Sequence, residues 1–274
     1  MMLNQIASLC LSHFLCQFNP KSKKRKTRDV VEEVALRLYS REKVDEFLDS
    51  NLPQFQKTLV EEFNARYSDR LPLRFQISDS AGLGDLVEGY RPQKQAREIS
   101  FQDALHAIPA ADFEKLAAII LQVLGCKEVF FTPASHDQGV DAFGYQDVVS
   151  PMPYGTIHHL TWIAQAKHYL ATHVTTGDVR ELVGSKELLL AKAFSSVDER
   201  YRELRLKHYA PAAIALITTE EIPSTVRRLA ESAGVFVFAA HDLFHILSPM
   251  LRTNSRASIS RLIKEKGKSI HTLK

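Results

Sequence analysis

The chain has 274 residues, of which 45% are hydrophobic and 24% charged, and its formal net charge is +3. This composition is ordinary for a soluble globular protein, and it excludes a disordered or low-complexity chain. The net charge is too small to indicate a nucleic-acid partner, so such a partner has to be argued from local basic patches.

The cysteines are few and show no pattern. Cys10, Cys16 and Cys126 form no CxxC pair and have no zinc-like spacing. An odd, sparse count indicates a reducing compartment without structural disulfides, and we therefore expect a cytoplasmic protein.

Residues 1–18 are apolar, but they lack the basic start and the small-residue cleavage site of a signal peptide. They are also too short and too polar to span a bilayer. Apolar residues recur at helical spacing, namely Leu3, Ile6, Ala7, Cys10 and Phe14. We expect an amphipathic helix that packs on the protein or a partner, with membrane association as the alternative.

The densest basic cluster of the chain, residues 21–28, follows this helix. Its central side chains, Lys24, Arg25 and Lys26, could contact DNA phosphates and gain affinity by counterion release. The alternative is a solvated linker. Residues 1–29 are thus predicted to be an amphipathic and basic N-terminal segment.

Residues 30–98 are predicted to be a mainly helical accessory region. Apolar stripes at helical spacing run through residues 30–67, and Pro53 should break or kink the second helix. Alternation over residues 71–77 predicts a half-buried strand, and a loop over residues 79–98 leads to a domain boundary near residue 98. We find no catalytic constellation here, so DNA binding, partner binding or oligomerisation is the expected role.

Residues 99–251 are predicted to be one α/β domain with a mixed central sheet flanked by helices. The expected helices are residues 110–124, 177–194, 198–208, 221–233 and 242–251, and the expected strands are residues 127–132, 139–145, 159–167, 212–218 and 235–238. Thr175 or Thr176 is the expected N-cap of the long helix. A basic tail over residues 252–274 closes the chain.

Two of these strands carry isolated charges in apolar, β-prone sequence. Asp141 follows Gly139 and Val140, and Lys167 ends a strand that also contains Gln165. Burying such a charge costs several kcal/mol unless a partner or a metal compensates. A carboxylate, an amide oxygen and an ammonium at neighbouring strand ends would suit Mg²⁺ beside a phosphodiester, since Mg²⁺ takes oxygen ligands and keeps several waters.

At these residues the chain resembles the Mrr-like branch of the PD-(D/E)xK nucleases, which includes methyl-directed and other restriction endonucleases. The resemblance extends loosely over residues 109–248, and Gln138 stands where the family often has glycine. It rests on Phe113-Glu114 in a helix, on Asp137-Gln138-Gly139-Val140-Asp141, and on Gln165-Ala166-Lys167 followed by Tyr169.

The resemblance implies a restriction-endonuclease-like fold and a role for each site residue. Asp141, Gln165 and Glu114 would hold Mg²⁺, with Mn²⁺ as a substitute, and Lys167 would position the attacking water or stabilise developing charge. Each residue also has an ordinary structural interpretation. Asp141 could be a strand-end carboxylate in water, Glu114 a first-turn acid favoured by the helix dipole, and Lys167 an extended side chain reaching solvent.

Further candidates surround this site. The segment between Asp141 and Gln165 contains prolines and is expected to be a loop that touches DNA or covers the site. Thr175, Thr176 and Arg180 begin a helix, where phosphates bind readily. The nearby histidines have no zinc-protease spacing, and zinc is not expected at His158, His159, His168 or His173.

The sequence therefore predicts a Mg²⁺-dependent endonuclease that hydrolyses phosphodiester bonds of DNA, double-stranded in the first instance. A role in restriction or anti-phage defence comes from the resemblance alone. The alternatives are a structure-selective repair or recombination nuclease and a catalytically inactive DNA-binding or partner-sensing module. A homodimer or a partner subunit would fit, membrane association is not expected, and the chain has no P-loop for NTP.

Overall fold

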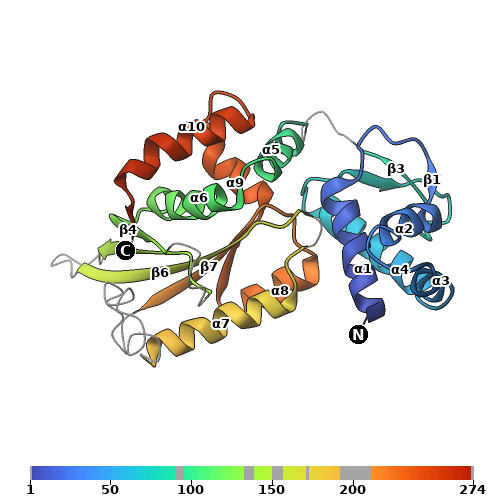
Figure 1. The fold of residues 1–274 in the computed structure, drawn as a ribbon, viewed down its shortest axis with the longest axis horizontal. Helices are drawn as coiled ribbons and strands as arrows, with labels where there is room; N and C mark the ends of the chain where they lie inside the picture. The colour runs from blue at the N-terminus through green and yellow to red at the C-terminus, as the bar shows by residue number, and fades with distance from the viewer. Residues whose placement is uncertain are drawn as a thin grey trace.

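The computed structural model describes residues 2–90, 96–132, 139–149, 157–170, 173–191 and 211–272. Figure 1 shows two units side by side: an N-terminal unit of helices with a small sheet, and a larger unit built around a central sheet. No helix in these ranges is long and apolar enough to cross a membrane.

The N-terminal unit has one hydrophobic core that runs from Ile6 to Val87. It contains α1 (Met2–Ser12), the π-helical turn η1 (His13–Gln17), α2 (Thr27–Ala35), α3 (Arg41–Ser50), α4 (Leu52–Ser68) and an antiparallel sheet of order β1-β3-β2, with β1 Arg25–Lys26, β2 Phe75–Ile77 and β3 Leu86–Gly89. The expected amphipathic helix is confirmed, because Ile6, Cys10 and Phe14 are fully buried in this core. The first helix therefore packs with the accessory region in a common core.

The basic run is part of this small sheet. Arg25 and Lys26 form β1, an edge strand paired with β3, and the Arg25 guanidinium lies 2.9 Å from Glu33. Arg25 and Lys26 are therefore part of a sheet and not of a linker, while the side chains of Lys24 and Lys26 are exposed. Edge strands often carry exposed lysines, because these discourage pairing with another chain.

Pro53 separates two helices as expected. α3 ends at Ser50 and α4 begins at Leu52, so Pro53 lies in the first turn of α4, where its missing N–H costs nothing. The expected strand over residues 71–77 is shorter and covers only β2. The expected loop over residues 79–98 contains β3 and the start of α5.

The larger unit is built on a six-stranded sheet of order β8-β7-β6-β5-β4-β9. β4 (Glu128–Phe131), β5 (Ala142–Val149) and β6 (Ile157–Lys167) are antiparallel neighbours, whereas β7 (Ala212–Thr218) and β8 (Val235–Phe238) continue parallel to β6, and β9 (His271–Thr272) is parallel to β4. The predicted α/β class with a mixed sheet is confirmed.

Helices cover both faces of this sheet. α5 (Ala96–His106), α6 (Ala110–Val123), α9 (Ala240–Leu247) and α10 (Arg256–Lys266) lie on one face, and α7 (Thr176–Leu190) and α8 (Ser224–Ser232) lie on the other (Figure 1). The alternation along β6 follows these layers: Trp162 and Ala164 join the core under α6, while Ile163 joins the core above α7. Side chains at odd positions of β6 therefore face α7.

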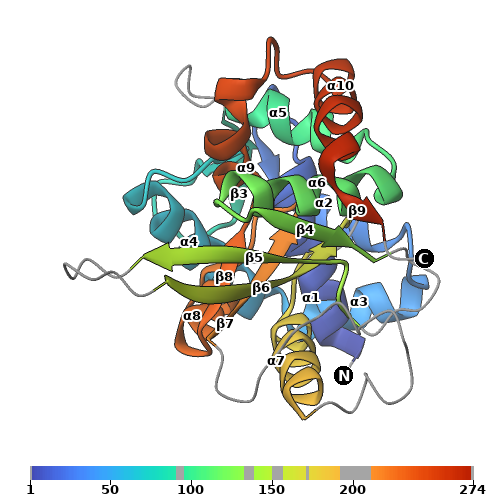
Figure 2. The same ribbon diagram turned by 90° about the vertical axis from the view of Figure 1, so that its left-hand side faces the viewer.

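Two expectations about loops and ends are corrected. The described parts of the segment between Asp141 and Gln165 are strand, because β5 and β6 pair from Ala142 with Ala164 to Val149 with Ile157. The part of this segment over residues 150–156 lies outside the described residues. The basic tail over residues 252–274 is not a tail: α10 buries Ile259, Leu262 and Ile263 in the main core, and β9 extends the sheet (Figure 2). The expected helix over residues 198–208 and the prolines at 151 and 153 lie outside the described residues.

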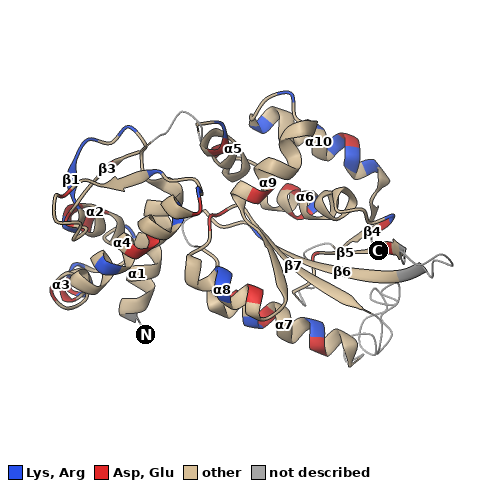
Figure 3. Ribbon diagram, turned by 180° about the vertical axis from the view of Figure 1, so that it is seen from behind, with Lys and Arg blue, Asp and Glu red and all other residues tan. Residues whose placement is uncertain are grey.

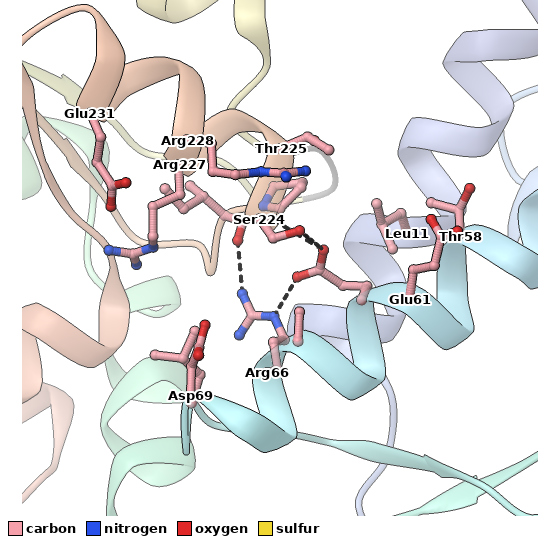
Figure 4. Close-up of a pocket in the computed structure, with 15 residues that line it drawn as sticks. Leu11, Thr58, Glu61, Arg66, Asp69, Ser224, Thr225, Arg227, Arg228 and Glu231 are labelled. Atoms are coloured by element: carbon pink, nitrogen blue, oxygen red, sulfur yellow. Dashed lines mark hydrogen bonds and ion pairs between the residues drawn. The ribbon is translucent and has the colours of Figure 1, made fainter.

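The two units meet through a buried charged cluster between α4 and the segment after β7. Arg66 donates from Nε to Glu62 at 2.9 Å, from Nη1 to Glu221 at 3.2 Å, and from Nη2 to the carbonyl of Ile222 at 2.9 Å. Glu62 also accepts from the backbone N–H of Ser224 at the start of α8. A cavity of about 510 Å³ lies beside this cluster, between α4 and α8 (Figure 4). None of the predicted catalytic residues lines it.

The cysteines are free and buried, as expected without disulfides. Burial raises the pKa of the Cys10 and Cys126 thiols to about 12. They are therefore thiols and not reactive thiolates at neutral pH.

Candidate active site

Asp141 lies just before β5, at the end of the sheet where β6 finishes. Its N–H donates to the carbonyl of Ala164, and its Oδ2 accepts from the N–H of Ala166 at 2.6 Å. Strand pairing of Ala142 with Ala164 puts Asp141 beside Gln165. The structure thus brings together the two segments that the sequence singled out.

Gln165 is almost completely buried, with 2% of its surface exposed. Its Nε2 is 3.5 Å from the carboxylate of Glu181, and among the described residues its Oε1 has no hydrogen-bond partner. A buried acceptor without a donor costs about 1–3 kcal/mol. That oxygen is therefore suited to a ligand that provides positive charge.

Lys167 ends β6 on the same face as Gln165. Its Nζ lies 3.7 Å from Asp178 and 3.6 Å from Glu181, and 19% of its side chain is exposed. Both acids come from α7, which crosses this face of the sheet. The ammonium is thus held by two carboxylates but remains reachable from solvent.

The two acids of α7 were not among the sequence candidates. Asp178, Glu181 and Ser185 are spaced three and four residues apart, so they share one face of the helix. The sequence shows this spacing, but only the crossing of α7 over β6 shows that the face looks toward Lys167. Figure 3 shows acidic and basic segments alternating along α7.

Asp178 also fixes the start of α7. Its Oδ2 accepts from the N–H and the hydroxyl of Thr175 at 2.7 and 2.8 Å, and its Oδ1 accepts from the Tyr169 hydroxyl at 2.6 Å. Burial alone would raise the pKa of Asp178, but these hydrogen bonds and Lys167 outweigh it and lower the pKa. The same site raises the pKa of Tyr169, chiefly by burial and then by its bond to Asp178. Asp178 is therefore ionised at neutral pH.

The capping geometry corrects one expectation about phosphate binding. Thr175 is the N-cap of α7, as predicted, but its hydroxyl is engaged with Asp178 and Gly177. The hydroxyl expected to be available for a phosphate is therefore in use. Thr176 is half-buried and Arg180 is exposed on the first turns. Contacts of DNA with these residues, or with Lys24, Arg25 and Lys26 on the other unit, stay predictions.

Gly139 allows the chain to pass close to these groups. Its φ is +73°, and a Cβ built there would lie 2.9 Å from Ser185 Oγ and 3.2 Å from Gln165 Nε2. Glycine adopts this conformation without the steric cost that other residues meet. The glycine before Asp141 therefore makes room for Gln165 beneath it.

Glu114 comes from the opposite layer. It is half-buried in the second turn of α6, the helix on the other face of the sheet from α7 (Figure 1). The start of α6 nevertheless lies at the correct end of the sheet, because the ring of Phe113 is 5.6 Å from that of His168, which follows Lys167. Glu114 would have to reach around this end to join Asp141, and its membership of the site stays a proposal. The preceding turn residues, His136 and Asp137, lie outside the described residues.

The oxygen atoms of Asp141 and Gln165 are of the kind that a hard divalent cation binds. Asp141 provides a carboxylate whose Oδ2 is oriented by a backbone N–H, and Gln165 provides a buried amide oxygen without a donor. Oxygen ligands of this kind fit Mg²⁺, which binds one or two carboxylates and completes its shell with water and substrate phosphate. The residues present therefore fit the ion that the sequence predicted.

Part of the chain is similar to known proteins. Residues 105–194 match the family model Mrr_cat, described as a restriction endonuclease. No protein of curated function matches the chain. Among solved structures, the restriction endonuclease MspJI in complex with a 27-mer oligonucleotide is similar at 17% identity and a TM-score of 0.47, covering 67% of this chain and 39% of that one.

The DNA modification-dependent restriction endonuclease AspBHI is similar at 14% identity and a TM-score of 0.44, covering 76% of this chain and 49% of that one. The chain thus spans less than half the length of either protein. The matched stretch contains Glu114, Asp141, Gln165 and Lys167 together with the α7 acids. Over residues 105–194 this chain is accordingly similar to the catalytic domain of Mrr-type restriction endonucleases.

Proposed function

We propose that the protein is a Mg²⁺-dependent endonuclease that hydrolyses phosphodiester bonds of double-stranded DNA. One observation carries this proposal: the buried Gln165 Oε1 lacks a hydrogen-bond donor among the described residues, next to Asp141 and on the same face as Lys167. A restriction-endonuclease family match over the same residues supports the choice of substrate and reaction.

In this proposal Asp141 and Gln165 hold the cation with Glu114, and Mn²⁺ can replace Mg²⁺. When bound, the ion would polarise the scissile phosphate and lower the pKa of a bound water. The contribution of the chain is to keep its ligands in place. The Ala166 N–H orients the Asp141 carboxylate, and the register between β5 and β6 sets Gln165 opposite it.

Lys167 supplies the positive charge of the site. Its Nζ is held at 3.6–3.7 Å by Glu181 and Asp178, distances that fix its position without a close ion pair. A preorganised ammonium of this kind stabilises charge that develops on the phosphate as the bond breaks. Asp178 is itself locked by Tyr169 and Thr175, so the hydrogen bonds at the start of α7 position the lysine.

Glu181 adds the negative charge that an amide at position 165 cannot provide. Its carboxylate lies next to Gln165 Nε2 and Lys167 Nζ, and 55% of its side chain is exposed. We assign it a positioning role, because it holds the amide with Oε1 directed away from α7 and restrains the lysine. A role in restriction or anti-phage defence and a cytoplasmic location belong to the same proposal, and the three buried free thiols fit the latter.

The test is cleavage of a supercoiled plasmid by the purified full-length chain with Mg²⁺, with Mn²⁺ and with EDTA. We expect cleavage with either ion and none with EDTA. Asp141→Ala and Lys167→Ala should each reduce the rate by at least about 100-fold, as removal of a preorganised charged group does. Neither change should alter the circular dichroism spectrum.

Two variants serve as matched controls. Asp147→Ala removes another carboxylate from β5, one that pairs with Lys127 at 2.6 Å, and Lys186→Ala removes another lysine, which pairs with Glu187 on α7. Both should cleave like the wild type. Equal cleavage by Asp141→Ala would disprove the site.

Further substrates separate the two alternative functions. A structure-selective repair or recombination nuclease would cut branched DNA much faster than linear duplex, whereas the proposed enzyme cuts duplex. A wild-type protein that binds DNA but cuts no duplex, branched or single-stranded substrate with either ion would be the inactive binding module.

A further inference from the structure

A second group of metal-binding side chains lies between α5 and α9. Glu98 is in the first turns of α5, and His241 and His245 are one turn apart on α9. One ligand atom from each of the three lies within 4.8 Å of the others. α5 and α9 pack against each other on the face of the sheet away from α7 (Figure 1). None of these residues belongs to the proposed nuclease site.

The distances are close to those of a metal ligand shell. His241 Nδ1 is 3.5 Å from Glu98 Oε2, and His245 Nε2 is 4.0 Å from Glu98 Oε1. In a tetrahedral site with ligands at 2.0–2.1 Å, ligand atoms are separated by about 3.3 Å. Small side-chain rotations would therefore bring all three groups onto one ion.

The polar atoms of the cluster form ion pairs that are too long for good hydrogen bonds. Glu98 Oε2 and His241 Nδ1 are buried and make no hydrogen bond with any of the described residues. They face each other at a distance where a direct bond is weak but a shared cation would satisfy both. As a long ion pair these two atoms stabilise each other only weakly, so a cation bound by both would add stability.

The surroundings hold the ligands in place and leave access. The backbone N–H of His241 donates to Glu221 at 2.8 Å, which anchors the start of α9 to the charged cluster at the junction. The two histidine rings are 4.5 Å apart at their centroids. His245 is 58% exposed, so an ion can enter from solvent and keep a water as a further ligand.

We propose that Glu98, His241 and His245 bind a transition-metal dication such as Zn²⁺. Two imidazoles and one carboxylate favour such ions over Mg²⁺, which prefers oxygen ligands. The ion would tie α5, the first helix of the larger unit, to α9. Its effect is therefore on stability and not on the chemistry of phosphodiester cleavage.

The experiment uses the full-length, tag-free protein after treatment with EDTA and removal of the chelator. We expect it to bind one Zn²⁺ per chain by calorimetry and to show the visible absorption of Co²⁺ on titration with that ion. Saturating Zn²⁺ should raise the melting temperature, since an ion that binds only the folded chain stabilises it. Saturating Mg²⁺ should not prevent Co²⁺ from binding at this site.

His245→Gln is the informative variant, because the exposed side chain can be replaced without disturbing the fold. Outer-shell groups alone are worth about 10- to 100-fold in metal affinity, so loss of a ligand should weaken Zn²⁺ binding by at least about 100-fold. Glu98→Gln should do the same. His159→Gln is the control, since His159 is also exposed and pairs with the carboxylate of Asp147.

Three outcomes would overturn the proposal: no Zn²⁺ binding by the wild type, no change in melting temperature, or equal binding by His245→Gln. Asp141→Ala should retain full Zn²⁺ binding. That variant separates this site from the nuclease site, so either proposal can fail without the other.

Discussion

Two clusters of charge in this molecule have opposite designs. At the junction of the units, Arg66 is 1% exposed and Glu221 is 1% exposed, and the guanidinium donates to carboxylates and carbonyls on both sides. At the end of the sheet, Lys167 reaches solvent and Gln165 keeps a buried oxygen without a donor among the described residues. Both clusters put charge into apolar surroundings at a cost.

The difference separates structure from function. A cluster whose donors and acceptors satisfy one another has nothing left to offer a ligand, and it holds two parts of the chain together. In a cluster with an unsatisfied acceptor and an accessible cation, the free-energy cost of burial is offset only when a ligand binds. On this reasoning, substitutions at the junction should reduce stability, whereas those at the sheet end should reduce cleavage.

The largest expected effect on stability is that of Arg66→Met. This change leaves Glu62 and Glu221 buried without their cation, and breaking a buried pair costs about 3–5 kcal/mol. Urea unfolding followed by circular dichroism should show this loss. Arg37→Met is the control, because Arg37 makes an exposed ion pair with Glu33 and should change stability by no more than about 0.5 kcal/mol. Equal free energies of unfolding for the two variants would show that the buried cluster does not stabilise the junction.

The second prediction concerns acid and the contact between α1 and the larger unit. His173 is 6% exposed, its Nε2 lies 3.4 Å from Ser8 Oγ on α1, and burial lowers its pKa from 6.5 to about 4. The carboxylates of Glu62 and Asp178 oppose this shift only in part. The unfolded chain therefore takes up the proton first, and the contribution of His173 to stability is lost as the pH falls from about 6.5 toward 4.

His173→Gln removes this titration and keeps a polar side chain beside Ser8. Between pH 7.5 and 4.5 the wild type should lose about 2–3 kcal/mol more stability than the variant, since one pKa unit corresponds to about 1.4 kcal/mol. The measurement is the free energy of unfolding at both pH values. Parallel losses in the two proteins would show that His173 is not the acid-sensitive group.

Of the three substitutions, Gly139→Ala should have the smallest effect on stability, but it should directly displace a side chain of the candidate site. The positive φ costs a residue with a Cβ about 1–2 kcal/mol, and the new methyl would displace Gln165. The activation free energy of plasmid cleavage should rise by more than the free energy of unfolding falls. Gly184→Ala on exposed α7 meets no atom within 4 Å, and it should stabilise the helix by about 0.5–1 kcal/mol without affecting cleavage. Normal cleavage by Gly139→Ala would mean that Gln165 is not a ligand.

The sequence alone could predict most of the elements and half of the site. Asp141 lies directly before β5, and Gln165 and Lys167 lie on its antiparallel neighbour β6, so their proximity follows from strand pairing and a period of two. The helix start at Pro53 and the N-cap at Thr175 were predicted as well, because both depend only on the adjacent backbone. The amphipathic first helix was visible because its apolar stripe is a property of spacing.

Only the tertiary structure decided which distant groups meet. Asp178 and Glu181 reach Lys167 because α7 crosses β6, and Glu98 meets His241 because α5 packs on α9. The pair of histidines one turn apart was present in the sequence, but His241 falls just before the predicted helix, so the spacing was missed. The basic C-terminal residues looked like a tail because charges outnumber the apolar residues of α10, although three of these are buried. Spacing along the chain determines local structure, whereas contacts between distant elements depend on how the layers pack, and packing is set by the whole core at once.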